Sequence, residues 1–224
     1  MLPLYLTMLI SLAVLVLAYR FAYTAPNAPM WLTRIPAPKY GSFFIYAGMF
    51  SVSGLLVYAL FMQIMLIPSP SMEPSLNTGD KILIKPAAFG LINPLTGSHM
   101  TEGNFDSLKR GDVVIGKFAY NADVRYIKRV IGLPGDTISI SKTELDINGN
   151  TYPFEPTDMP DIFVIEIESK RFKIKISPDG KFQPQQNVTI PRNHVFLLGD
   201  NLNKSSDSRE IGFIPLKNLI GKPF

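Results

Sequence analysis

Two long, uncharged apolar runs near the N-terminus constrain this chain more than any other feature. They cover residues 2–19 and 42–67. A helix rises about 1.5 Å per residue and the hydrocarbon core of a bilayer is about 30 Å thick, so about 20 residues cross it. The runs therefore predict transmembrane helices over residues 1–19 and 42–67. The alternative for the first run is a cleavable signal peptide, but such a peptide normally begins with positive charge, and no Lys or Arg precedes this run.

The segment between the runs, residues 20–41, sets the expected orientation. It contains Arg20, Arg34 and Lys39 and has no Asp or Glu. Short, positively charged loops stay on the cytoplasmic side of a membrane. We therefore expect a cytoplasmic loop in a multi-pass protein of the cytoplasmic (inner) membrane. Residues 68–224 should then form an extracytoplasmic domain, on the periplasmic side in a cell with two membranes.

Charge and composition exclude several classes of site in that domain. Its Lys and Arg are nearly balanced by the 18 Asp and Glu of the chain, all of which lie after residue 67. Nucleic-acid binding requires a concentrated basic face, so no nucleic-acid partner is expected. The chain has no cysteine, which excludes disulfides and a thiol nucleophile. Its two histidines, His99 and His194, lie in no metal-binding pattern, so neither a metal nor another cofactor is predicted.

After residue 67 the sequence is typical of antiparallel β-structure. Short apolar stretches alternate there with Gly, Pro, Asn and Asp, and Asn148-Gly149 is a strong hairpin signal. The expected strands cover residues 81–85, 112–117, 124–131, 137–140, 145–147, 162–168, 172–176 and 194–198. We therefore predict a mostly β fold: two N-terminal transmembrane helices, then an antiparallel β domain with a small inserted β subdomain at about residues 137–197.

Gly-Asp dipeptides recur in this domain at residues 79–80, 111–112, 135–136 and 199–200. Glycine supplies positive φ and aspartate bonds nearby amides, so each pair first predicts a turn. Only the fourth is followed by further polar candidates, at Asn201 and in the Ser-rich residues 205–209.

A serine and a lysine are the candidate reactive groups. Ser71 lies in a Pro-rich segment just after the second apolar run. A serine hydroxyl is a weak nucleophile until a base takes its proton, and here the candidate base is a lysine kept neutral by burial. Lys128 lies in an expected strand whose alternation places Tyr126 and Val130 on the same face. The alternatives are a solvated strand lysine and an ordinary turn serine.

Four segments, taken in order, closely resemble the bacterial type I signal peptidases (leader peptidases), which are Ser–Lys dyad serine proteases. They cover residues 68–76, 111–114, 125–136 and 199–209. The most specific contains Tyr-Ile-Lys-Arg followed by Gly-Leu-Pro-Gly-Asp, at residues 126–136. The resemblance implies a serine endopeptidase with Ser71 as nucleophile and Lys128 as general base. It also implies an oxyanion hole made by the Ser69 hydroxyl and the Ser71 backbone N–H.

The same resemblance implies supporting roles and a substrate. Ser205 would orient the lysine, and Asp207 and Arg209 would form an ion pair that Arg129 could share. Exported preproteins with small residues at the first and third positions before the cut would be the substrates. The residues expected to wall the substrate pockets are Ile67, Pro68, Met72, Leu76, Tyr126 and Ile127. The family often has Arg after Gly-Asp-Asn, where this chain has Leu202, which puts a local ion pair in doubt.

Two alternative functions stay open on the sequence. One is a different Ser–Lys peptidase with a dedicated substrate, such as a pilin-maturation enzyme; a self-cleaving repressor is disfavoured by the two apolar runs and by the lack of a DNA-binding region. The other is a non-catalytic, membrane-tethered β domain that binds exported peptides.

Overall fold

The computed structural model describes residues 63–86, 88–90, 103–117, 125–178 and 180–224, together with Gly48, Ser51 and Gly54. The chain divides into two compact units, residues 1–59 and 60–224. The predicted helix over residues 1–19 and the loop over residues 20–41 lie outside the described residues, as does most of the second predicted helix. No helix within the described ranges is both long enough and apolar enough to cross a bilayer.

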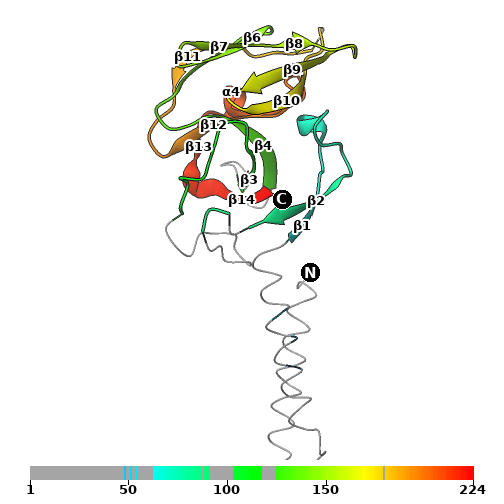
Figure 1. Cartoon of the computed structure of the whole chain (residues 1–224), viewed down its shortest axis with the longest axis vertical. Coiled ribbons are helices and arrows are strands. Elements are labelled where there is room, and N and C mark those ends of the chain that lie inside the picture. Colours follow the sequence, from blue (N-terminus) through cyan, green and yellow to red (C-terminus); the bar gives the residue numbers. More distant parts are fainter. Residues whose placement is uncertain are drawn as a thin grey trace, which may run out of the picture. The chain divides into compact units, whose positions relative to one another are not determined.

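The second unit is built on a seven-stranded antiparallel sheet, with strand order β1-β2-β14-β3-β4-β12-β13 (Figure 1). Its strands are β1 (Gln63–Leu66), β2 (Lys81–Lys85), β3 (Val113–Lys117), β4 (Arg125–Gly132), β12 (His194–Leu198), β13 (Ile214–Pro215) and β14 (Leu219–Pro223). Short helical turns join some of them: η1 (Pro70–Met72), α4 (Ser208–Ile211) and η2 (Leu216–Asn218). The mostly β, antiparallel fold predicted from the sequence is confirmed.

Between β4 and β12 the chain forms two smaller sheets, with strand orders β11-β5-β6-β7 and β10-β9-β8. Their strands are β5 (Thr137–Ile140), β6 (Glu144–Ile147), β7 (Asn150–Pro153), β8 (Glu155–Pro156), β9 (Ile162–Ile167), β10 (Lys170–Lys175) and β11 (Gln185–Thr189). Figure 1 shows most of these strands at the end of the domain away from β1 and β2. The predicted boundary at residue 197 is wrong, because β12 pairs with β4 in the large sheet. An apolar strand does not reveal in its sequence which sheet it joins.

The second apolar run also ends differently from the prediction. Residues 63–66, expected to be helical, form β1 and pair with β2. Ile64 and Leu66 are exposed on this edge strand, while Gln63 and Met65 are partly buried. The prediction of a helix to Ile67 is therefore wrong for these residues. Lack of charge alone cannot distinguish the end of a membrane helix from an apolar edge strand.

The glycines of the four Gly-Asp pairs differ in backbone conformation. Gly79, Gly111 and Gly135, the first three glycines of the Gly-Asp pairs, have φ of +94°, +80° and +89°, a conformation that favours glycine. The hairpin predicted at Asn148-Gly149 joins β6 to β7, again with positive φ at both residues. These turn predictions are confirmed, whereas Gly199 is not among the described residues with positive φ.

Strand β4 contributes side chains to both faces of the large sheet. Lys128 lies opposite Val114 of β3, and Val114 belongs to the same buried cluster as Val130. Ile127 lies opposite Ile115, and these two belong to a different buried cluster. The predicted alternation of β4 is therefore confirmed, and it carries the Lys128 side chain into the protein interior.

Candidate active site

The backbone around Ser71 is held in a tight turn. Ser69 is extended, with φ −140° and ψ 156°, and Pro70 begins the short helix η1. Proline fixes φ near −65° and restricts the residue before it to extended conformations, so the sequence itself favours this geometry. The turn is closed by a hydrogen bond from the Glu73 N–H to the Pro70 carbonyl (3.2 Å). Ser71 is thus buried on a segment with little conformational freedom.

Lys128 and Ser71, which are 57 residues apart in sequence, meet in the structure. The distance from Lys128 Nζ to Ser71 Oγ is 2.8 Å. Lys128 is only 3% exposed and also donates to the Ile127 carbonyl oxygen (3.2 Å). Ser69 Oγ donates to Ser71 Oγ at 3.2 Å. Three residues singled out from the sequence therefore form one hydrogen-bonded group.

The surroundings of Lys128 lower the pKa of its ammonium group. Burial is the largest cause, because it removes water from the charged form. The carboxylates of Asp207 and Asp200 act in the opposite direction, and the charge of Arg209 adds to the lowering. The net result is a pKa lowered from 10.5 to about 8. A substantial fraction of Lys128 is therefore neutral slightly above neutral pH and can accept a proton from Ser71.

This pKa predicts the pH dependence of peptide hydrolysis. Only the neutral amine acts as a base, so kcat/KM should fall about tenfold per pH unit well below pH 8 and level off above it. The measurement is kcat/KM against pH in detergent, with a substrate that does not titrate in this range. His194→Gln is the control and should leave the limb in place. An acidic limb near pH 10, the ordinary lysine range, would contradict the burial of Lys128.

A series of backbone hydrogen bonds connects Ser71 to the inserted strands. The Asn201 N–H donates to the Ser71 carbonyl oxygen at 3.0 Å. On either side of Asn201, the Lys175 N–H donates to the Asp200 carbonyl (2.7 Å) and the Leu202 N–H donates to the Lys175 carbonyl (2.9 Å). Strand β10 therefore braces the segment that holds the nucleophile. Leu202 itself is buried in the hydrophobic cluster of the inserted region.

Arg129 supports these backbone hydrogen bonds and does not join the Asp207–Arg209 ion pair. Its Nε and Nη2 donate to the two carboxylate oxygens of Asp200 at 2.8 and 2.6 Å, and Nη1 donates to the Gly111 carbonyl at 2.8 Å. The guanidinium also lies 4.0 Å from the centre of the Phe172 ring. The expectation that Arg129 shares the Asp207–Arg209 pair is therefore wrong. The sequence did not reveal Asp200 as its partner, because the two residues lie on separate strands and loops.

The ion pair between Asp207 and Arg209 is present and buried. Arg209 Nε and Nη2 donate to Asp207 Oδ1 and Oδ2, each at 2.8 Å. Asp207 Oδ2 also accepts from the Gly199 N–H at 3.0 Å. The pair therefore links the start of α4 to the Gly-Asp-Asn segment beside Ser71.

Ser205 lies close to the nucleophile but does not hydrogen-bond to Lys128. Its Oγ is buried and has no hydrogen-bond partner among the described residues. A Cβ placed on Gly199 would lie 2.2 Å from Ser205 Oγ and 2.4 Å from the Ser71 carbonyl oxygen. The absence of a side chain at Gly199 thus allows Ser205 and the Ser71 carbonyl oxygen to approach its backbone closely. The sequence had predicted only a turn at this glycine.

The residues expected to wall the substrate pockets divide into two groups. Ile67, Met72 and Ile127 are buried in one cluster and are at most 3% exposed. They form the packed base of the site, because their strands and turn face the core. Pro68 is exposed and Leu76 is partly buried, so their side chains have surface that solvent reaches.

Tyr126, the remaining expected wall residue, is partly buried and packs against the cluster that contains Val114 and Val130. It lies on the same face of β4 as Lys128, two residues away, as the alternation predicted. Its role as a wall of the substrate pocket remains a prediction from the sequence.

The sequence of this chain is similar to those of known proteins. The chain is 31% identical over 183 residues to a signal peptidase I of Pseudomonas aeruginosa, covering 70% of this chain and 62% of that protein. It is 30% identical over 171 residues to a signal peptidase I of Bacillus licheniformis, covering 76% and 78%. The chain thus spans about 62% of the length of the Pseudomonas relative.

Similarity extends to a solved structure and to a family of peptidases. A crystal structure of a signal peptidase I from Enterococcus faecalis V583 is 27% identical, with a TM-score of 0.36, covering 52% of this chain and 97% of that one. The family described as "Signal peptidase, peptidase S26" matches residues 39–224. That match includes Ser71, Lys128 and all the supporting residues described above. The chain belongs to the signal peptidase family, peptidase S26.

Proposed function

We propose that this protein is a serine endopeptidase that releases signal peptides from exported preproteins by cutting after small-x-small sites. The observation that carries the proposal is the buried Lys128 amine, with a lowered pKa, 2.8 Å from the Ser71 hydroxyl. Membership of the signal peptidase family supports the substrate class.

The geometry supports a two-step hydrolysis. In the first step Ser71 Oγ attacks the scissile carbonyl carbon while neutral Lys128 takes the hydroxyl proton. The Ser69 hydroxyl and the Ser71 N–H donate to the developing oxyanion. The Lys128 ammonium then gives its proton to the leaving amine, which breaks the peptide bond and leaves an ester on Ser71. In the second step Lys128 takes a proton from water while the water oxygen attacks the ester carbon. The Lys128 ammonium then returns the proton to Ser71 Oγ as the ester bond breaks, and the signal peptide leaves as a carboxylic acid.

We further propose that the reaction takes place at the outer surface of the cytoplasmic membrane. The two uncharged runs, over residues 2–19 and within residues 42–62, have the composition of membrane spans, and three positive residues lie between them. Ser71 follows closely in the chain after the second run. A signal peptide still in the bilayer would present its cleavage site at that depth.

The test is cleavage of a preprotein with an Ala-x-Ala site by the full chain in detergent. Wild type should cut it, and Ser71→Ala should lower kcat/KM by about 10⁴-fold or more, since the nucleophile is lost. Ser75→Ala removes an exposed hydroxyl from the same loop and should retain near-normal activity. Its two hydrogen bonds, to the Lys173 carbonyl oxygen and from Arg129 Nη2, are both long at 3.5 Å, and Arg129 keeps its shorter bonds to Asp200 and Gly111. A wild-type protein that binds the preprotein without ever cutting it would instead indicate the non-catalytic peptide-binding function.

A further inference from the structure

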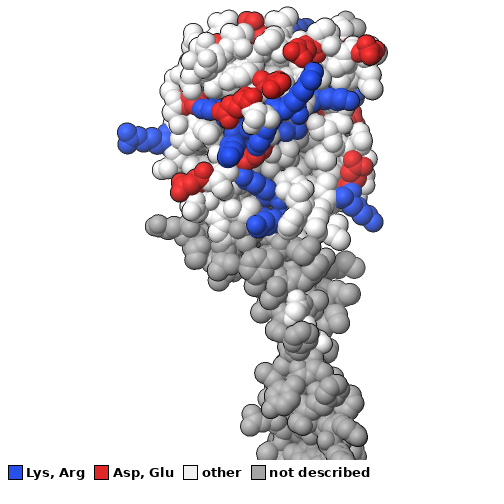
Figure 2. Space-filling model, in the orientation of Figure 1, with Lys and Arg blue, Asp and Glu red and all other residues white. Residues whose placement is uncertain are grey.

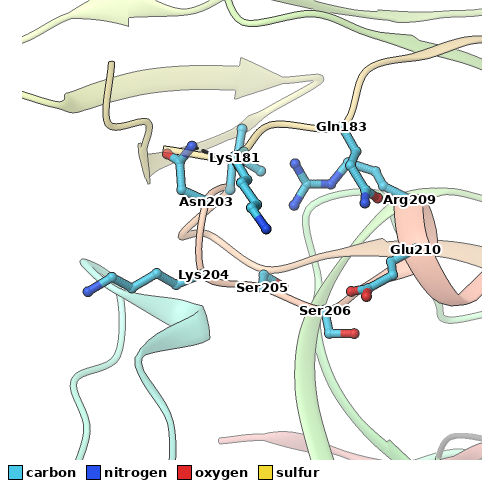
Figure 3. A pocket seen from close by; sticks show the side chains of 9 residues that line it. Lys181, Gln183, Asn203, Lys204, Ser205, Ser206, Arg209 and Glu210 are labelled. Carbon is cyan, nitrogen blue, oxygen red and sulfur yellow. Dashed lines mark hydrogen bonds between the residues drawn. The ribbon is translucent and has the colours of Figure 1, made fainter. Parts of the chain in front are cut away.

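A polar cavity of about 280 Å³ lies next to the active site. Its walls come from Lys181 and Gln183, from the loop over residues 202–206 and from helix α4 (Figure 3). The mechanism described above does not use this cavity. Its volume is below the range of typical small-molecule sites, about 300–1,000 Å³, and suits one or two side chains.

The cavity lies close to the segment that carries the nucleophile, with Ser205 as the shared residue. Ser205 forms part of its wall, and the same side chain crowds Gly199 together with the carbonyl oxygen of Ser71. Pro68, Leu76 and Tyr126, the accessible residues expected to contact the acyl side of the substrate, do not line it. A polypeptide that contacts those residues and passes Ser71 would therefore find different walls on its leaving-group side.

The cavity has a local excess of positive charge. Lys181 and Lys204 line it, and Glu210 is the one acidic residue in its wall. In Figure 3 the Lys181 side chain extends toward Ser205, while Lys204 points outward at the rim. Within the described ranges neither lysine takes part in an ion pair. Arg209, also in the wall, is already neutralised by Asp207.

The charges on the wider surface of the domain are of mixed sign. Figure 2 shows basic side chains gathered across the middle of one face of the domain, with acidic ones among them. Exposed charges of mixed sign are screened over about 8–10 Å in physiological salt. Only charges within a few ångströms of a substrate side chain therefore discriminate strongly, and in the cavity wall these are Lys181, Lys204 and Glu210.

We propose that this cavity receives the first side chains of the mature protein, just after the scissile bond, and favours an acidic one. The proposal rests on the preprotein-cleaving function above and adds a preference on the leaving-group side. A carboxylate entering the cavity would approach the Lys181 ammonium, whereas a lysine there would face repulsion from it. Glu210 weakens this discrimination without reversing it.

The test compares preproteins that share one signal peptide and one Ala-x-Ala site and carry Glu, Gln or Lys at the second and third mature positions. Because ion pairs with exposed lysines are weak, kcat/KM for the Glu substrate should exceed that for the Lys substrate only by about two- to fivefold. High salt should reduce the ratio. The double variant Lys181→Glu/Lys204→Glu should reverse the preference, while Lys217→Glu, an equal charge change outside the cavity, should preserve it.

The outcomes separate this proposal from the one before it. If wild type cuts all three substrates at equal rates, or if the double variant keeps the preference for Glu, the assignment of the cavity is overturned and the peptidase function stands. If wild type cuts none of them, the peptidase function itself fails.

Discussion

Replacing Lys128 by methionine is expected to lower kcat/KM for preprotein cleavage by about 10⁴-fold or more, while the domain remains folded. Methionine has nearly the same length as lysine and suits the buried position, but it cannot accept the Ser71 proton. Removal of one member of a cooperating catalytic group costs about as much as removal of all of them, so Ser71→Ala/Lys128→Met should lose little more. The assay is cleavage in detergent, with circular dichroism to verify the fold.

The same variant should be more stable than wild type at neutral pH. The folded-state pKa of Lys128, about 8, lies below the ordinary value of 10.5. Burying the protonated amine therefore destabilises the folded state at pH values below 10.5. A shift of this size corresponds to roughly 3 kcal/mol at pH 7, because each pKa unit is worth about 1.36 kcal/mol. Between pH 8 and 10.5 the unfolded chain binds more protons, so wild-type stability should rise with pH there.

Thermal unfolding of the full chain in detergent measures this difference. Lys173→Met, which removes an exposed lysine of β10, is the matched control and should leave stability and its pH dependence nearly unchanged. A Lys128→Met protein that cleaves normally would exclude the lysine as base. One that is inactive but clearly less stable than wild type would contradict the desolvation argument.

Gly199→Ala is expected to reduce kcat by about 10²-fold or more, although alanine adds only a methyl group. The new Cβ would lie 2.4 Å from the Ser71 carbonyl oxygen, a backbone atom, and 2.2 Å from Ser205 Oγ. One of them must move, and a displacement of about 1 Å at a reacting group costs on the order of 10²-fold. The crowding should also cost about 1–3 kcal/mol of stability.

Gly132→Ala is the control that distinguishes damage to the active site from the general effect of crowding a buried glycine. A Cβ there would lie 2.3 Å from the Ile190 side chain and 2.9 Å from that of Ile138, both flexible ends and both remote in sequence from Ser71. We expect a lower melting temperature for both variants but near-normal kcat for Gly132→Ala. Equal kcat values for the two variants would show that Gly199 has no special role beside the nucleophile.

The sequence by itself determined the local features of this protein. The eight expected strands form, because apolar alternation and turn residues act over a few neighbouring positions. The turns at Gly79, Gly111 and Gly135 follow from the positive φ that glycine tolerates. Ser71 and Lys128 were identifiable because a specific order of short motifs surrounds them, and that order also indicated the family.

Only the tertiary structure decided which of these features meet. It placed β12 in the large sheet, ended the second apolar run in strand β1, and paired Arg129 with Asp200 instead of Asp207. It also made Gly199 a residue of close approach. Strand pairing, ion-pair choice and crowding depend on residues far apart in sequence, and the periodicity of a single segment contains no information about its distant neighbours.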